Sequence, residues 1–288
     1  MKKALLSILI PIYNNKEGVQ KILDCLYKID LKTSSSIEVF ISDDSEKPLL
    51  SKSDVRNLEE KFYFFKYIFN KPKFGSVKNM NQLIDLSKGD YFWILHHDEY
   101  WDKENNIIKV IIENLTNKKD VYFLPIKKVK NIILGDLVIH ISQKHSHYKY
   151  FHNIVIKNPY LLLKANILGP PSSLIISNKF KKNYNEKLKF LLDIDYYIDL
   201  IKKIDINNTC IYKNKDLEIL SSQNNEGSVT KKLGFHKKII QKKERLFLEK
   251  TYKVKESLFN FLIDNIFYIL FKLVTLFSIR FNINKRIS

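Results

Sequence analysis

Hydrophobic and polar positions alternate along the first part of the chain in a way that predicts strands and helices in turn. Residues 4–10 form an almost continuous apolar run, and the segment from Pro11 to Asn15 has the composition of a turn. Residues 37–41 form a second, β-branched run. Between them, residues 17–29 place apolar side chains at the spacing of one helical face. The order predicts a β-α-β unit that begins with a buried strand.

The same pattern continues as far as residue 95. A short strand is expected around residues 67–69, a helix over 77–86, and another apolar strand over 91–95. Continuous apolar strands separated by helices are typical of a parallel sheet covered on both faces. We therefore expect an α/β fold with a doubly wound, mostly parallel sheet. In such sheets, ligands bind at the carboxyl ends of the strands.

Composition and charge narrow the class of protein. A chain of 288 residues with 45% hydrophobic content can bury a full-sized core, so we expect one large domain, residues 1–225, with an appendage over 226–288. The formal net charge of +18 favours an anionic partner such as a nucleotide, a membrane face or nucleic acid. The excess is mostly Lys in a chain also rich in Asn and Ile, so part of it reflects a genome poor in G and C.

The N-terminus and the cysteines bear on location. Lys2 and Lys3 followed by an apolar run imitate a secretory signal, but no small-residue cleavage site follows, and we assign the run to the first strand. Cys25 and Cys210 are far apart and form neither a disulfide framework nor a zinc motif. This usage fits a reducing compartment, so the expected location is cytoplasmic.

Polar side chains follow the predicted strands at the point where each one ends. They are Asn14, the pair Asp43 and Asp44, and the cluster at residues 96–99 with the sequence His-His-Asp-Glu. Each alone is best explained as a turn former or a cap. Together, along one rim of a sheet and without basic neighbours, they favour a site for a divalent cation and a nucleotide.

A second candidate element lies in the other half of the chain. Ile194, Tyr197, Ile198 and Ile201 form the buried face of a predicted helix, from which Asp195 and Asp199 point away. Asp193 sits in the first turn. A capping role and a catalytic role for Asp193 are equally compatible with the residues alone.

These motifs, in this order, resemble the family 2 glycosyltransferases of the GT-A fold. The resemblance covers roughly residues 5–225 and rests on segments 7–14, 38–45, 70–81, 88–91, 96–99, 169–175 and 191–197. It implies an inverting enzyme that moves a hexosyl or related sugar from a nucleotide diphosphate donor to an acceptor hydroxyl. Bacterial relatives of this size build surface polysaccharide or lipooligosaccharide, which implies a glycan or lipid-linked acceptor.

The resemblance also implies roles for single residues. Asp98 matches the second Asp of the family's Asp-x-Asp motif and is the expected ligand of Mn²⁺ or Mg²⁺, whereas His96 replaces the first Asp and removes one negative charge. Asp193 matches the general base. The residues expected to bind the nucleotide sugar are Pro11, Tyr13, Asn14, Asp43, Asp44, Lys78, Asn79, His96 and His97.

The chain changes character after about residue 225. A Lys-rich segment is followed by an apolar stretch, residues 258–279, that a narrow polar stripe interrupts. A helix of this kind with basic flanks fits attachment of residues 231–279 to the membrane surface, on the inner face of the cell membrane. The alternative is that it packs on the catalytic domain or on a second copy of the chain, so a homo-oligomer remains open.

Four histidines in the middle of the chain, His140, His145, His147 and His152, lack an acidic or cysteine partner. We expect a solvated or acceptor-lining segment there and no metal site.

Two other functions are compatible with parts of this sequence. A non-catalytic protein that binds nucleic acid or membranes explains the charge but leaves the acidic strand ends unexplained, and we expect no nucleic-acid partner. A nucleotidyltransferase would lack the Asp193 motif and usually has a Gly-rich basic phosphate loop, which is not found.

Overall fold

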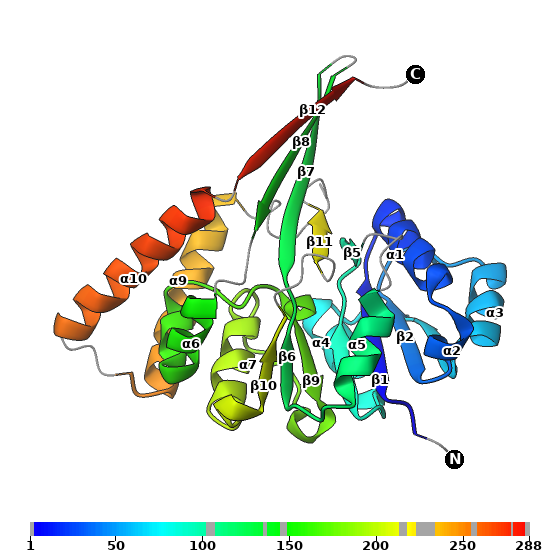
Figure 1. The fold of residues 1–288 in the computed structure, drawn as a ribbon, viewed down its shortest axis with the longest axis horizontal. Helices are drawn as coiled ribbons and strands as arrows, with labels where there is room; N and C mark the ends of the chain where they lie inside the picture. Colours follow the sequence, from blue (N-terminus) through cyan, green and yellow to red (C-terminus); the bar gives the residue numbers. More distant parts are fainter. Residues whose placement is uncertain are drawn as a thin grey trace.

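The structure is a computed structural model and describes residues 3–101, 107–134, 137–144, 149–212, 218–222, 234–254, 258–277 and 279–285. A seven-stranded sheet with the order β10-β6-β9-β4-β1-β2-β3 forms its centre (Figure 1). Strands β1, β2, β3 and β4 are parallel to one another. Strand β9 lies between β4 and β6 and is antiparallel to both. The bounds are β1 Leu6–Ile12, β2 Ile37–Asp43, β3 Phe64–Phe69, β4 Tyr91–Ile94, β6 Val121–Phe123, β9 Leu174–Ser177 and β10 Thr209–Ile211. The expected mostly parallel α/β sheet is confirmed.

Helices cover both faces of this sheet. Their bounds are α1 Lys16–Lys28, α2 Leu31–Ser34, α3 Lys52–Lys61, α4 Ser76–Leu86, α5 Ile107–Leu115, α6 Lys149–Lys157, α7 Leu192–Ile201, α9 Gly234–Thr251 and α10 Leu258–Phe277. Short 3₁₀ helices are η1 Pro159–Leu163, η2 Pro171–Ser173, η3 Asn178–Phe180 and η4 Ile206–Asn208. Side chains of α1 and α5 pack on one face, and those of α4, α6 and α7 pack on the other.

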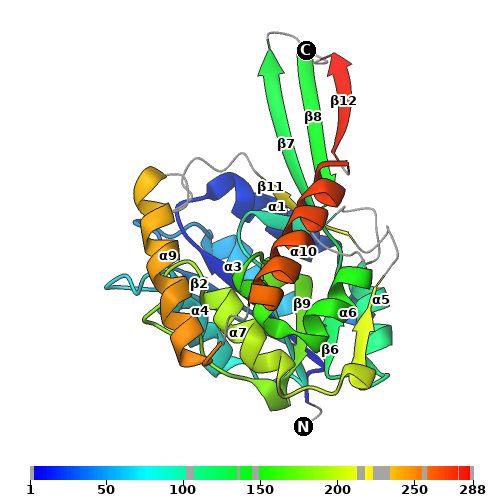
Figure 2. The ribbon, with the colours of Figure 1, turned by 90° about the vertical axis from the view of Figure 1, so that its left-hand side faces the viewer.

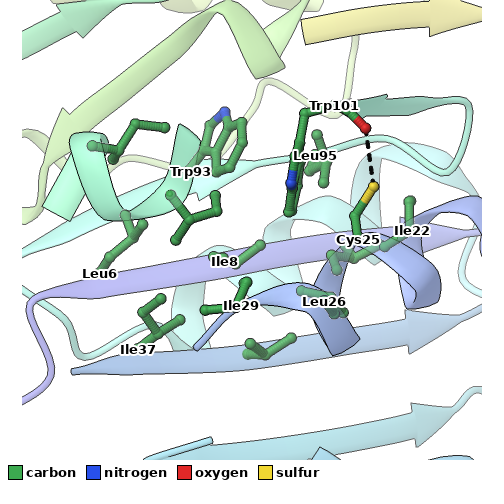
Figure 3. Close-up of a cluster of buried hydrophobic side chains, with 14 of the residues drawn as sticks. Leu6, Ile8, Ile22, Cys25, Leu26, Ile29, Ile37, Trp93, Leu95 and Trp101 are labelled. Carbon is green, nitrogen blue, oxygen red and sulfur yellow. Dashed lines mark hydrogen bonds between the residues drawn. The ribbon is translucent and has the colours of Figure 1, made fainter. Parts of the chain in front are cut away.

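Strand β1 shows why the sequence selects this arrangement. All seven of its residues are buried, because alternate side chains enter opposite cores. Ile8 joins the core under α1, and Leu9 joins the core under α4. In the first of these cores, the Cys25 thiol donates a hydrogen bond to the Trp101 carbonyl at 3.2 Å (Figure 3).

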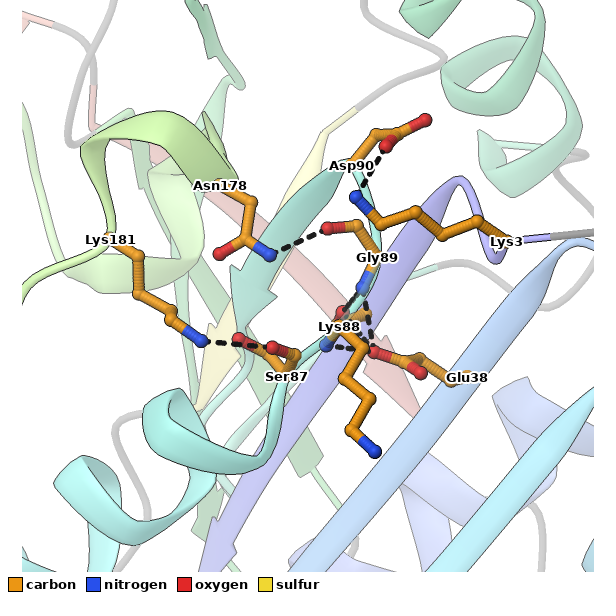
Figure 4. A network of polar contacts seen from close by, with 9 residues as sticks. Lys3, Glu38, Ser87, Lys88, Gly89, Asp90, Asn178 and Lys181 are labelled. Carbon is orange, nitrogen blue, oxygen red and sulfur yellow. Dashed lines mark hydrogen bonds and ion pairs between the residues drawn. The ribbon is translucent and has the colours of Figure 1, made fainter.

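A buried carboxylate fixes the amino-terminal end of the sheet, away from the polar strand ends. Glu38 accepts hydrogen bonds from the Ser7 hydroxyl (2.5 Å) and from the backbone N–H groups of Lys88 (2.6 Å) and Gly89 (2.8 Å) (Figure 4). A Cβ at Gly89 would lie 2.7 Å from the Ser7 hydroxyl oxygen, so a side chain does not fit there. This network holds the start of β4 against β1 and β2.

A second sheet, which the sequence did not predict, has the order β12-β8-β7-β11-β5. Its strands are β5 Glu99–Trp101, β7 Ile126–Leu134, β8 Leu137–Lys144, β11 Ile219–Ser222 and β12 Arg280–Lys285. Strands β7, β8 and β12 project from the body of the molecule as an arm (Figures 1 and 2). Strand β5 follows β4 closely, so the chain crosses from one sheet to the other at residues 95–98.

The C-terminal helices pack on the domain, as the alternative for this segment expected. Leu248 of α9 and Phe267 and Phe271 of α10 belong to the same hydrophobic core as α7. Other side chains of α10 remain exposed, namely Ile266, Tyr268, Ile269, Leu270, Leu273 and Leu276. Among the described helices, none combines the length and apolar character that crossing a bilayer requires.

Candidate functional site

The turn after β4 brings the two sheets together. Leu95 still donates its backbone N–H to the Leu9 carbonyl (2.9 Å), as a strand residue would, and the chain then turns. The Glu99 N–H closes the turn on the His96 carbonyl (2.9 Å), and the Ser222 N–H of β11 binds the Asp98 carbonyl (2.8 Å). The turn is therefore fixed by backbone contacts on both sides.

Glu99 is the buried acidic member of this turn. Its side chain is 2% exposed and accepts a hydrogen bond from the His96 backbone N–H at 3.0 Å. Burial, and then the neighbouring charge of Asp98, raise the pKa of Glu99 to about 8. Asp98 itself is partly exposed. The two adjacent carboxyl groups therefore differ in environment, and Asp98 is the one open to a ligand.

Helix α7 places Asp193 beside the same turn. Asp193 retains some solvent access although atoms surround it densely, and this burial raises its pKa to about 6. Two further influences come from the turn, because the field of His96 lowers this pKa and that of Glu99 raises it. Asp193 and the 96–99 turn, which are distant in the sequence, thus lie close enough for their charges to interact.

Asp193 does not cap its helix. The N-cap position of α7 is Leu191, which makes no side-chain cap hydrogen bond, and Asp193 is the second residue of the helix. Tyr184 and Tyr197 are buried near Asp193. Burial raises the pKa of both hydroxyl groups, and the negative charges of Asp193 and Glu99 raise it further. The helical periodicity placed Tyr197 on the buried face of α7, but nothing in the sequence marked Tyr184 or Tyr197 as a site residue, because each resembles an ordinary core residue.

His97 connects the turn to β1 and α1. Its Nδ1 lies 3.4 Å from the Pro11 carbonyl oxygen, and burial lowers its pKa. Its own carbonyl lies 3.5 Å from the Asn15 amide nitrogen. A Cβ at Gly18 would lie 2.0 Å from this carbonyl oxygen, so only glycine allows α1 to approach the turn so closely. A glycine in the first turn of a predicted helix was the available signal for this contact.

Asp43 ends β2 with both of its carboxylate oxygens hydrogen-bonded. It is 0% exposed and accepts hydrogen bonds from the backbone N–H groups of Ser45 (2.9 Å) and Leu49 (2.8 Å) and from the Tyr67 hydroxyl (2.5 Å). These bonds shape the loop after β2, which is the turn-forming role that an isolated Asp at this position suggested.

Asp44 and Asn79 are buried next to Asp43. Asp44 accepts the backbone N–H groups of Phe74 (2.7 Å) and Gly75 (2.8 Å), directly before α4. The Asn70 amide group bridges Asp44 (3.2 Å) and the Asn79 side-chain oxygen (3.1 Å). A carboxylate at the start of a helix is stabilised by the N–H groups there. Asp44 and Asn79 thereby join the loop after β2 to α4.

The remaining predicted residues lie at the rim. Asn14 has a positive φ of 46°, donates its N–H to the Ser45 hydroxyl (2.8 Å), and accepts the Glu46 N–H (3.1 Å). Tyr13 is partly exposed, with the Lys73 ammonium 5.7 Å from its ring centre. Lys78 of α4 is 62% exposed; its ammonium lies 3.9 Å from a carboxylate oxygen of Glu186.

The histidine cluster divides. His145 and His147 lie outside the described residues, and His140 belongs to β8. His152 is buried in the core with its ring centre 5.0 Å from that of Phe123, and burial lowers its pKa to about 4. The expectation of a solvated or acceptor-lining position is wrong for His152, because α6 turns it inward. Among the described residues, no three His, Cys, Asp or Glu side chains are arranged to hold a metal ion by themselves.

Comparison with known proteins agrees with this geometry. The profile described as "Glycosyl transferase family 2" matches residues 7–160, which is more than half of the chain. The chain belongs to glycosyl transferase family 2. The matched region includes β1, the loop after β2 and the 96–99 turn. The polar strand ends therefore lie in the part of the chain that matches a family of glycosyl transferases.

Two curated relatives of this chain are themselves named as sugar-transferring enzymes. The amylovoran biosynthesis glycosyltransferase AmsB of Erwinia amylovora is 30% identical over 136 residues, 46% of this chain and 44% of that protein. The abequosyltransferase RfbV of Salmonella typhimurium is 27% identical over 120 residues, 41% of this chain and 34% of that protein. The match thus spans less than half the length of these relatives.

Solved structures share the fold of this family 2 glycosyltransferase. S. aureus TarS 1-349 in complex with UDP-GlcNAc has a TM-score of 0.56 and 19% identity, covering 78% of this chain and 60% of that chain. The mannosyltransferase PcManGT from Pyrobaculum calidifontis, in complex with GDP-Man and Mn²⁺, has a TM-score of 0.51 and 12% identity, covering 89% and 66%. At these identities the likeness concerns the fold.

Proposed function

We propose that this protein is an inverting glycosyltransferase that moves a hexosyl or related sugar from a nucleotide diphosphate donor to an acceptor hydroxyl. The observation that carries the proposal is the meeting of Asp193 with the 96–99 turn. A partly accessible carboxylate therefore lies near the strand end at which doubly wound sheets bind nucleotides.

Asp193 is the proposed general base. It takes the proton from the acceptor hydroxyl while that oxygen bonds to the anomeric carbon, and the bond from this carbon to the diphosphate breaks on the opposite face. The nucleoside diphosphate leaves with the bonding electrons, and the configuration inverts. With a pKa of about 6, Asp193 is mostly ionised near neutral pH and able to accept the proton.

Asp98 is the proposed protein ligand of Mn²⁺ or Mg²⁺. Such ions are commonly held by one or two carboxylates together with substrate phosphates, and one accessible carboxylate beside two imidazoles fits a site that the donor completes. When bound, the ion offsets the charge that develops on the leaving diphosphate. His96, where the family usually has a carboxylate, makes the site less negative and its imidazole nitrogen suits Mn²⁺ better than Mg²⁺.

The donor site is proposed along the rim formed by β1, β2 and α4. Pro11, Tyr13, Asn14, His96 and His97 border it, with Tyr13 available to stack on a base. Asp43, Asp44 and Asn79 lie buried below, where their hydrogen bonds fix the backbone of the rim. Lys78 reaches the diphosphate if its side chain leaves Glu186. The ion pair between Lys78 and Glu186 is exposed to solvent and therefore weak.

The proposed acceptor is a bacterial surface glycan under construction, such as capsular polysaccharide or lipooligosaccharide, in a lipid-linked form. The similarity to AmsB, named as an amylovoran biosynthesis glycosyltransferase, supports a role in glycan biosynthesis. The exposed apolar side chains of α10 and the Lys-rich α9 support contact of residues 231–279 with the anionic inner face of the cell membrane. A homo-oligomer is compatible with the same surface.

The test is turnover of a panel of nucleotide sugars with Mn²⁺, followed as release of free nucleoside diphosphate, for the wild-type chain and for Asp193→Asn. The proposal expects release with at least one donor and loss of that release in the variant. Release that does not depend on Asp193, or no metal-dependent nucleotide binding at all, would contradict it. The family match disfavours the nucleotidyltransferase and non-catalytic alternatives.

A further inference from the structure

Helix α9 contacts the chain on both sides of Asp193. Before α7, the Glu244 carboxylate accepts three consecutive backbone N–H groups, from Lys189 (2.7 Å), Phe190 (3.0 Å) and Leu191 (2.9 Å). Glu244 is 8% exposed, so water competes little for these bonds. The carboxylate thus determines the path of the three residues that lead into α7.

The bond from Leu191 meets a need of α7 itself, and the other two fix the segment that leads into the helix. The first N–H groups of a helix and of the segment leading into it lack helical partners, and a side chain at the N-cap usually supplies one. Leu191 occupies the N-cap and has no such side chain. The carboxylate of Glu244, on a helix distant in the sequence, accepts the N–H groups of residues 189–191 instead. Its negative charge also interacts favourably with the positive end of the α7 dipole.

A second contact lies on the other side of Asp193. The Tyr252 hydroxyl, directly after α9, lies 2.7 Å from a carboxylate oxygen of Asp195 and 3.1 Å from the Asp195 carbonyl. Leu248 is fully buried between Glu244 and Tyr252. The Tyr252 N–H still bonds to the Leu248 carbonyl (2.9 Å), so the helical path continues to Tyr252 and these three side chains form a single stripe directed at α7. The periodicity of α7 placed Asp195 outside its buried face; the structure buries it because this stripe covers it.

We propose that Glu244 is a positioning residue for glycosyl transfer, which holds the first turn of α7 so that the Asp193 carboxylate meets the acceptor hydroxyl. This inference rests on the proposed role of Asp193 as base. Glu244 touches neither substrate nor reacting atoms. It acts through the backbone of residues 189–191, which its carboxylate holds from α9.

The chemistry of the side chain predicts a graded series of variants. Glu244→Ala removes all three acceptors. Glu244→Gln keeps one carbonyl oxygen, which can accept Phe190 and Leu191, but turns an NH₂ group toward the Lys189 N–H. Glutamine therefore restores part of the contact and not all of it. Displacement of a catalytic group by about 1 Å can lower turnover about 10²-fold.

The experiment compares Glu244→Ala, Glu244→Gln and Leu248→Ala in the full chain, well below their melting temperatures. Leu248→Ala is the matched control, because it weakens packing of α9 on the same core and leaves the carboxylate in place. We expect Glu244→Ala to lower kcat by about 10-fold to 10²-fold with the donor KM nearly unchanged. Glu244→Gln should recover part of kcat, and Leu248→Ala should retain it while losing stability.

Amide hydrogen exchange at residues 189–191 provides a readout independent of turnover. If exchange there accelerates in Glu244→Ala but kcat matches that of Leu248→Ala, Glu244 is only structural and the inference is overturned. Failure of the proposed function gives a different result, since Asp193→Asn would then retain wild-type turnover. If Glu244→Ala does not fold, the comparison of Glu244→Gln with Leu248→Ala decides in the same way.

Discussion

Asp193 lies within electrostatic reach of His96, a residue that the sequence places on a different element and that the fold brings near it. The field of the His96 imidazole lowers the pKa of the Asp193 carboxyl, while burial raises it, and the balance is a value of about 6. A base poised in this range is ionised at neutral pH yet basic enough to take a proton.

The pH dependence of kcat/KM follows from this value. The folded pKa is above the ordinary value of Asp, so activity should be full above about pH 7 and should fall about tenfold per unit below pH 6, as the base becomes protonated. Rates from pH 5 to 8 at saturating metal check this. Asp199 lies on the same helix but pairs with surface lysines, so Asp199→Asn should leave the acidic limb of the pH profile, the fall in activity below pH 6, unchanged. A flat profile between pH 5 and 7 would argue against Asp193.

Replacing His96 tests the contact itself. His96→Gln removes an imidazole whose field favours the ionised carboxyl, so the acidic limb should move to higher pH. The position of the limb, and not the rate, is the measured quantity, because His96 also borders the proposed donor site. A limb that stays where it was would mean that the two residues do not interact in solution.

Asp98→Asn should weaken nucleoside diphosphate binding only when metal is present. Loss of the carboxylate lowers affinity for the ion, and we expect about a tenfold or larger rise in the dissociation constant of UDP or GDP with Mn²⁺. Calorimetry with Mn²⁺ and again with a chelator measures the difference. Equal affinity of wild type and variant in Mn²⁺ would remove Asp98 from the metal site.

Gly18→Ala separates helix propensity from local packing. Within a helix, alanine is usually favoured over glycine by about 1 kcal/mol. At this position its Cβ would overlap the His97 carbonyl, so we expect destabilisation of about 1–3 kcal/mol and lower activity. Urea unfolding measures the sign directly. Gln20→Ala, exposed on the same helix, is the control and should change stability little. A stabilised Gly18→Ala chain would show that α1 does not approach the turn this closely.

Membrane contact is testable on α10. The full chain should sediment with vesicles that contain anionic lipid, and Ile269→Glu with Leu273→Glu should weaken this by about tenfold or more, because each buried apolar side chain contributes roughly 1.5–3 kcal/mol. Leu31→Glu, at a still more exposed apolar position on α2, should bind like wild type. Unchanged binding of the double variant would place the contact elsewhere.

Sequence patterns gave the parallel sheet and its strand ends because burial on both faces leaves a continuous apolar run, as in β1. They did not give the second sheet, since β5 and β11 have only three and four residues and pair across long sequence separations. Asp193 was recognised by its motif. Glu244 was not, because a glutamate in a Lys-rich helix resembles a solvated residue until the N–H groups of 189–191 are seen against it.

The most direct test of the central claim is single-turnover sugar transfer by Asp193→Asn, measured together with donor affinity. Asparagine keeps the shape of the side chain and cannot accept the proton, so transfer should fall by about 10²–10⁴-fold while the donor dissociation constant stays within about twofold of wild type. Transfer at the wild-type rate, or a loss explained entirely by weaker donor binding, would contradict the assignment of Asp193 as the base.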